Sequence, residues 1–209
     1  MDLRILENTP PWDWPKDTDV FLLEILRDCR VDVADRLLAV GFAGDCVVIN
    51  DELVDALLSI LQSNGEPELL RGMAAIALGP VLDTGDIELM GMDEFDEPDD
   101  VPISLQTFKM IQATFHKLYT EAAVPEEVRR RILEASVRAP QDWHKGAIRA
   151  AYASDDEDWK LTAVFGMNYI RGFDEQIRES LDSDNSDIRY EAERAAGAGE
   201  DDEDSDFAF

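Results

Sequence analysis

The segment FDEQIRESLDSDNSDIRYEAERAAGAG (residues 173–199) decides the fold of this chain. Ile177 and Leu181 share one face of a short first helix, and an Asp-rich turn follows it. Arg189 opens a second helix in which alanines recur from Ala192 onward, so that neighbouring helices can approach closely. A single short helix pair cannot bury both of its faces, and the segment therefore predicts stacked pairs.

The same pattern recurs elsewhere in the chain. Residues 147–163 match residues 176–192 at a constant offset of 29 residues. In each copy an apolar helix ends in Ser-Asp, and a short acidic turn follows. An apolar residue and a basic residue come next, and a small residue lies three positions after the basic one. Residues 53–79 follow this plan more loosely. Recurrence at a fixed offset is typical of repeat architectures.

This pattern resembles the HEAT repeat family, in the short bacterial form that phycobilin-lyase-like proteins also contain. The resemblance is good over 126–199, fair over 50–80, and weak over 1–45 and 84–121. It implies an all-α fold, an α-solenoid of stacked antiparallel helix pairs. In the family, Asp/Arg pairs of this kind bridge the turns, which implies structural roles for Asp184 with Arg189.

The remainder of the chain also shows helical spacing of apolar residues, with no convincing strand pattern. After residue 103 we expect helices at about 104–121, from Pro125, and at about 141–153, 157–171, 173–182 and 186–198. The expected organisation has five parts. These are an irregular N-terminal cap (1–17), N-terminal helical repeats (18–83), an acidic inserted loop (84–103), C-terminal HEAT-like repeats (104–199) and an acidic disordered tail (200–209).

Charge is the unusual feature of the composition. The chain has 47 acidic and 19 basic residues, a formal net charge of −28. Such a surface repels phosphate, which argues against non-specific nucleic-acid binding and against docking on anionic membranes. Two interpretations remain: an acidic surface directed at a basic protein, or a solvated surface suited to a high-salt cytoplasm. The spread of acid along the whole chain favours the second.

Compartment signals are few. The N-terminus lacks a basic stretch followed by an apolar run, and no apolar segment approaches the length needed to span a bilayer. Cys29 and Cys46 are the only cysteines, and we expect both to be small buried side chains in a reducing compartment. A cytoplasmic location is therefore expected.

No recognisable catalytic or metal-binding motif is present. His116 and His144 are expected on separate helices, and neither has a ligand-type neighbour at the spacing of a zinc site. The run DSDNSD (182–187) lacks the glycine and the distal glutamate of a calcium-binding EF-hand loop. We therefore predict no enzymatic activity, no metal and no cofactor.

Six residues are candidates for binding a partner. The stretch 125–150 is the only net-positive part of the chain, and its arginines either balance neighbouring acid or form a cationic ridge for an acidic segment. Aromatic side chains on successive C-terminal helices belong either to the core or to a binding face. The candidates are Arg130, Arg131, Trp143, Arg149, Trp159 and Tyr169.

The favoured hypothesis is a protein-interaction scaffold that binds a basic protein on the concave face of the solenoid. The resemblance offers a second possibility, a phycobilin-lyase-like handler of a tetrapyrrole. A third is nucleic-acid mimicry, in which acidic turns imitate phosphates. Fold alone does not choose among these roles.

Overall fold

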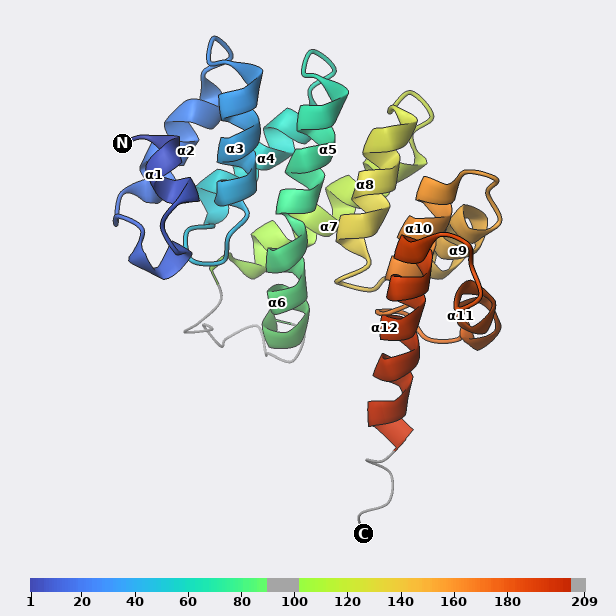
Figure 1. The fold of residues 1–209 in the computed structure, drawn as a ribbon. Coiled ribbons are helices and arrows are strands. Elements are labelled where there is room, and N and C mark those ends of the chain that lie inside the picture. The colour runs from blue at the N-terminus through green and yellow to red at the C-terminus, as the bar shows by residue number, and fades with distance from the viewer. Residues whose placement is uncertain (90–101, 204–209) are drawn as a thin grey trace. The chain divides into compact units, whose positions relative to one another are not determined.

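The computed structural model describes residues 1–89 and 102–203, and within these ranges the chain is all-helical (Figure 1). This confirms the predicted all-α class. The chain divides into two compact units, Met1–Ala139 and Pro140–Phe209. In the described ranges no helix combines the length and the apolar character that crossing a membrane requires.

The first unit contains short helices joined by tight turns. In chain order these are α1 (Leu3–Glu7), the 3₁₀ helix η1 (Pro11–Asp13), α2 (Thr18–Arg27), α3 (Val33–Ala43), α4 (Asp51–Gln62), α5 (Glu68–Ala77), α6 (Gly79–Leu89), α7 (Leu105–Thr120) and α8 (Glu126–Ser136). Polar side chains fix several of the starts. Asn50 accepts a hydrogen bond from the Leu53 N–H at 2.9 Å, and Ser104 accepts one from the Thr107 N–H at 3.2 Å.

Consecutive helices of this unit pack as pairs, α2 with α3, α4 with α5 and α7 with α8. The pairs also contact one another on both sides. The first helices form the row α2–α4–α7, and the second helices form the row α3–α5–α8 (Figure 1). Helix α1 packs on α3, and α6 contacts α5, α7 and α8.

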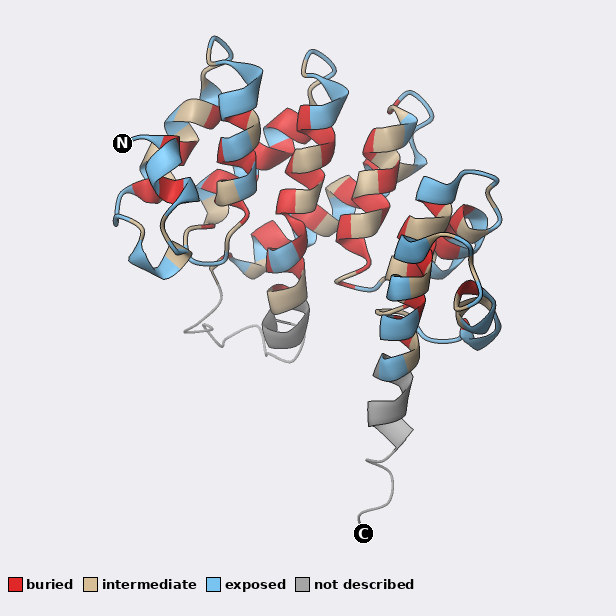
Figure 2. Cartoon of the chain, viewed as in Figure 1, coloured by how far each residue is buried: buried red, intermediate tan, exposed pale blue. Residues whose placement is uncertain are grey.

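The core of this unit lies between the two rows. Leu53, Leu57 and Leu61 recur at intervals of four along α4, and all three are fully buried. Figure 2 shows the buried residues on the sides of the helices that face each other, with the exposed residues at the turns and along the outer faces of the helices. Burial of each such leucine contributes about 2 kcal/mol.

The second unit repeats the pairing. Its helices are α9 (Asp142–Tyr152), α10 (Glu157–Gly166), α11 (Asp174–Ser180) and α12 (Ser186–Glu203). Helix α9 packs on α10, α11 packs on α12, and α10 contacts both α11 and α12. Ile148, Trp159 and Phe173 are buried in its core.

Two N-terminal expectations are wrong. Residues 3–7 form α1 instead of irregular chain, because Leu3 and Leu6 are buried under one face of a single helical turn. Cys29 and Cys46 are exposed, since both lie in turns beyond the last residues of α2 and α3. The Trp14 ring packs edge-on to Phe42, at 5.5 Å between ring centroids.

The structure also changes the limits of two predicted segments. Helix α6 continues to Leu89, so the first part of the expected 84–103 loop is helical. Val81 and Leu82, both fully buried, hold this helix on the unit. Helix α12 continues to Glu203, into the expected 200–209 tail. The rest of these two segments, 90–101 and 204–209, lies outside the described residues.

Candidate functional site

A basic side chain occupies the fourth position of the second helix in every pair. The five residues are Arg36, Arg71, Arg129, Lys160 and Arg189. The fourth position lies in the first turn of its helix, beside the C-terminal end of the preceding helix. A cation there can hydrogen-bond the last carbonyl groups of that preceding helix and oppose its dipole.

Two of the five side chains donate to a carbonyl near the end of the preceding helix, and a third donates to a carbonyl in the connecting turn. Arg36 Nη2 donates to the Leu26 carbonyl at 3.3 Å, and Arg71 Nε donates to the Leu61 carbonyl at 2.9 Å. Arg189 donates to the Ser183 carbonyl, in the turn that joins α11 to α12. These cations therefore hold helix pairs together.

Arg36 makes one further contact, an ion pair with the next turn along the stack. Its two terminal nitrogens each donate to a Glu66 carboxylate oxygen at 2.7 Å, and the Arg36 side chain is almost fully buried. The hydrogen bond from Arg36 holds the pKa of the Glu66 carboxyl below its usual value. Sequence reasoning missed this pair, although the position of Arg36 four residues after the Asp32 cap was a usable signal.

Ion pairs within α8 occupy both of its predicted partner-binding arginines. Arg130 is only 7% exposed and pairs with Glu127 at 2.8 Å. Arg131 is half-buried and pairs with Glu127 at 2.9 Å and with Glu134 at 3.0 Å. Burial raises the pKa of the Glu127 carboxyl, but the hydrogen bonds and charges of the two arginines outweigh that effect, and the net pKa is lowered. These arginines balance acid on their own helix.

Glycines on α5 and α6 leave room for the side chains of Arg131, on α8, and Arg138, which lies beyond the end of α8. A Cβ added at Gly72 would lie 3.1 Å from Cγ of Arg131, and one added at Gly79 would lie 2.9 Å from Nε of Arg138. The arginine side chains thus lie against bare backbone, where any larger residue would displace them. Arg130 and Arg131 therefore take part in the ion pairs of α8, and Arg131 also packs against Gly72.

The three predicted aromatic residues belong mainly to the packing of the second unit. Trp159 is buried, and Tyr169 lies half-buried against Phe165 at 5.4 Å between ring centroids. Trp143 donates from its indole nitrogen to the Gln141 side chain at 2.8 Å and stacks on His144 at 3.8 Å. His144 is fully buried, and its Nδ1 accepts the Gln141 N–H at 2.8 Å, which caps α9.

Arg149 is the only one of the six that is exposed. Its guanidinium carbon lies 5.8 Å from the ring centroid of Phe173, and the Lys145 ammonium lies 6.0 Å from the same centroid. Gly172, with φ 92°, lets the chain pass beside the Lys145 side chain. Both exposed residues thus place a cation over the same buried aromatic ring.

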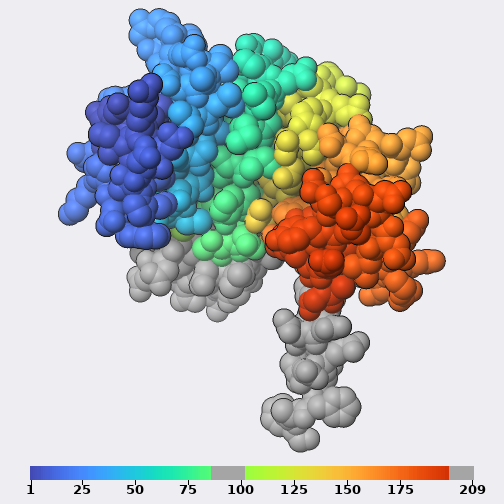
Figure 3. Space-filling model, in the orientation of Figure 1, coloured from blue at the N-terminus to red at the C-terminus, as the bar shows by residue number. Residues whose placement is uncertain are grey.

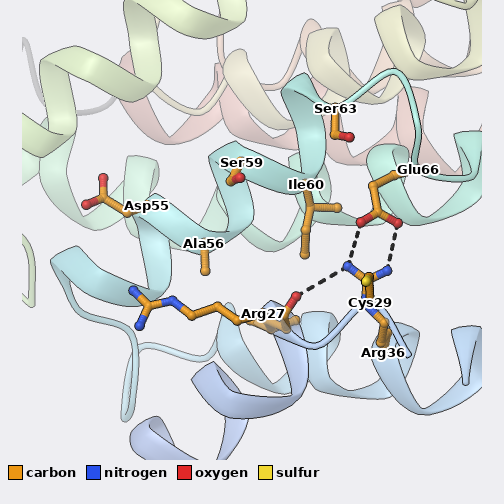
Figure 4. Close-up of a pocket in the computed structure, with 10 residues that line it drawn as sticks. Arg27, Cys29, Arg36, Asp55, Ala56, Ser59, Ile60, Ser63 and Glu66 are labelled. Carbon is orange, nitrogen blue, oxygen red and sulfur yellow. Dashed lines mark hydrogen bonds and ion pairs between the residues drawn. The ribbon is translucent and has the colours of Figure 1, made fainter. Parts of the chain in front are cut away.

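A pocket of about 360 Å³ opens between the end of α2 and the outer face of α4 (Figure 4). The Arg36–Glu66 pair forms one wall, and the Arg27 side chain extends past Asp55 on the other side. The Cys29 thiol also lines the pocket. Because the charges of Arg36 and Glu66 already neutralise each other, this ion pair is suited to holding the α2–α3 and α4–α5 pairs together.

A second and larger hollow, of about 600 Å³, lies at the amino end of the first unit. We call it the amino-end groove. Six of its ten lining residues are apolar, and the other four are three carboxylates and one arginine. The groove is lined by Met1, Asp2, Leu3, Arg4 and Glu7 of the α1 segment, Phe21 and Ile25 of α2, Val31, and Asp35 and Leu38 of α3. In Figure 3 the dark blue α1 lies beside the lighter blue α3 that forms the other side.

Within the described ranges, no three His, Cys, Asp or Glu side chains gather where they could hold a metal ion. No protein-family model matches the sequence, and comparison with curated proteins gives no match either.

Proposed function

We propose that this chain is a HEAT-like repeat scaffold that binds a basic protein. Two observations support the solenoid part of the proposal. Helix pairs contact one another through both rows in the first unit, and the same basic position recurs in the second helix of every pair. Stacked pairs of this kind offer long outer faces for binding a partner.

The distribution of buried charge carries the functional part. Among the described residues, three arginines are buried, Arg36, Arg71 and Arg130, while no aspartate or glutamate is. Arg36 and Arg130 are paired with carboxylates, and in the described ranges the excess of acid that makes the net charge −28 lies on partly or fully exposed side chains. The outward field is therefore negative, and a basic protein is attracted to it.

Affinity capture from a lysate of the source organism tests the proposal. The chain is immobilised and washed at about 0.05 M and then at about 1 M salt, where the screening length falls from above 10 Å to about 3 Å. We expect a basic protein to be retained at low salt and released at high salt. An unrelated acidic protein of similar net charge serves as the control bait. Retention of nothing, or of the same proteins by both baits, would contradict the proposal.

A further inference from the structure

We propose that the amino-end groove binds a basic amphipathic helix of the partner. This inference rests on the proposed function and names the place and the form of recognition. Apolar side chains from three helices converge in the groove. Phe21, Ile25 and Val31 are only partly buried, and Leu38 is 37% exposed. A hollow of about 600 Å³ is large enough to take several apolar side chains.

Further apolar side chains of the same segments are exposed. Met1, which lines the groove, is 52% exposed, and Ile5 of α1, which is not among the lining residues, is 53% exposed. Val33, at the start of α3, is 41% exposed. Apolar side chains gathered in a hollow beside charged ones mark a protein-interaction site more often than singly exposed apolar residues do.

The rim of the groove determines the charge of the occupant. Asp2, Glu7 and Asp35 line it, against the single guanidinium of Arg4. A second copy of this chain would bring further acid to an acidic rim, since each copy carries a net charge of −28. A partner with apolar side chains on one face and lysine or arginine on its flanks complements both the apolar and the acidic residues that line the groove. An amphipathic helix presents that combination along one side.

The test uses a fluorescent peptide of about 18 residues, or about five helical turns, with leucine on one face and lysine on the other. A scrambled peptide of identical composition controls for charge attraction alone. Fluorescence anisotropy with the full chain gives both dissociation constants at about 0.15 M salt. We expect the ordered peptide to bind about tenfold more tightly than the scrambled one.

Leu38→Ser removes an apolar side chain from the groove, and Leu69→Ser removes an equally apolar one from the exposed surface of α5, where Leu69 is 61% exposed. We expect Leu38→Ser to weaken binding of the ordered peptide about tenfold and Leu69→Ser to leave it unchanged. Both leucines are exposed, so neither change should prevent folding, and circular dichroism checks this for each variant. Equal binding by the two variants would overturn the assignment of the groove.

A second pair of variants separates local from long-range charge. Glu7→Lys with Asp35→Lys reverses the rim, and Glu52→Lys with Glu68→Lys makes the same net change at exposed positions outside the groove. We expect the rim pair of substitutions to raise the dissociation constant of the ordered peptide at least fivefold more than the outer pair does. Equal losses would mean diffuse attraction only, which overturns the proposal.

The lysate experiment keeps the two proposals distinguishable. If the Leu38→Ser bait retains the same basic protein as the parent chain does, the scaffold function stands and the groove assignment fails. If the parent retains no basic protein but binds the ordered peptide in the groove, the proposed function fails instead.

Discussion

Gly44 ends α3 at a point where the next helix pair comes very close. A Cβ added there would lie 2.3 Å from the Ala77 carbonyl oxygen and 2.8 Å from the Ala77 Cα, both main-chain atoms that cannot rotate away. We therefore expect Gly44→Ala to lower the free energy of unfolding by about 2 kcal/mol or more.

Gly41 is the matched control for this change, because it lies on the same helix and a Cβ there meets nothing within 4 Å. We expect Gly41→Ala to raise the free energy of unfolding by about 0.5–1 kcal/mol through helix propensity. Urea denaturation of the two variants measures both effects. Equal stabilities would show that α3 and α5 do not approach at Gly44 as described.

The ion pair between Glu66 and Arg36 makes the stability of the first unit depend on pH in the acid range. The folded chain holds the pKa of Glu66 below its usual value, so the native carboxyl binds its proton less tightly than the unfolded one. Its stabilisation is therefore present above the unfolded pKa and is lost as pH falls through the folded pKa.

We expect Glu66→Gln to lower the free energy of unfolding by about 2 kcal/mol at pH 7, because it leaves a buried guanidinium without its carboxylate. The loss should shrink as pH falls into the acid range, where the parent chain loses the same ion pair. Glu52→Gln, at an exposed position on α4, is the control. Urea titrations at several pH values measure how the free energy of unfolding changes with pH. The same pH dependence in Glu66→Gln as in the parent chain would contradict this account.

At the scale of single helices, α11 is the least anchored element of the second unit. It has seven residues, and Ser180 is its only buried one. By contrast, α10 buries Trp159, Ala163 and Val164 among others. Short helices are marginal without tertiary contacts.

We therefore expect the amides of α11 to exchange with solvent well before those of α10 in native-state hydrogen exchange followed by mass spectrometry. The pairing of the two helices within one unit makes α10 an internal reference. Protection of α11 equal to that of α10 would show that packing on α12 stabilises it more than its burial indicates.

Most helices after residue 103 could be predicted because their ends carry local signals. Helix α9 falls inside the expected 141–153, and α8 follows Pro125 as expected. Helix α10 ends at Gly166 instead of about 171, since the Asn168 side chain donates to the Phe165 carbonyl and competes with the helical ladder. The short α1 was missed because a single turn leaves no periodic signal.

The candidate site could be predicted much less well. The sequence marks the expected partner-binding residues by type and spacing alone, and in the structure Arg130 and Arg131 pair with acid on their own helix. Sequence spacing does not reveal which cations are already paired. The amino-end groove depends on residues of α1, α2 and α3 coming together, and α1 was not expected to be a helix at all.

For the whole molecule, net charge should govern the response to salt. A charge of −28 destabilises the compact state through self-repulsion, which salt screens. Buried pairs such as Arg36 with Glu66 are screened much less. We expect the melting temperature to rise by about 5 °C or more between about 0.1 M and 1 M NaCl.

A charge-reduced variant is the control for this prediction. It carries Glu52→Gln, Glu68→Gln, Asp182→Asn and Glu193→Gln, all at exposed positions. Its melting temperature should depend less on NaCl than that of the parent chain does. Calorimetry measures both, and equal salt responses would show that salt acts through burial of apolar surface instead.

The recurring arginine also has a genetic consequence. Arg36 and Arg71 lie 35 residues apart, and each donates to a carbonyl ten residues earlier in its own helix pair. Unequal crossing-over between these two codons would therefore insert or delete one 35-residue unit, and the product would keep an arginine and its acceptor at every junction. A gene built in this way can lengthen or shorten its protein in a single recombination event, without first evolving a new turn.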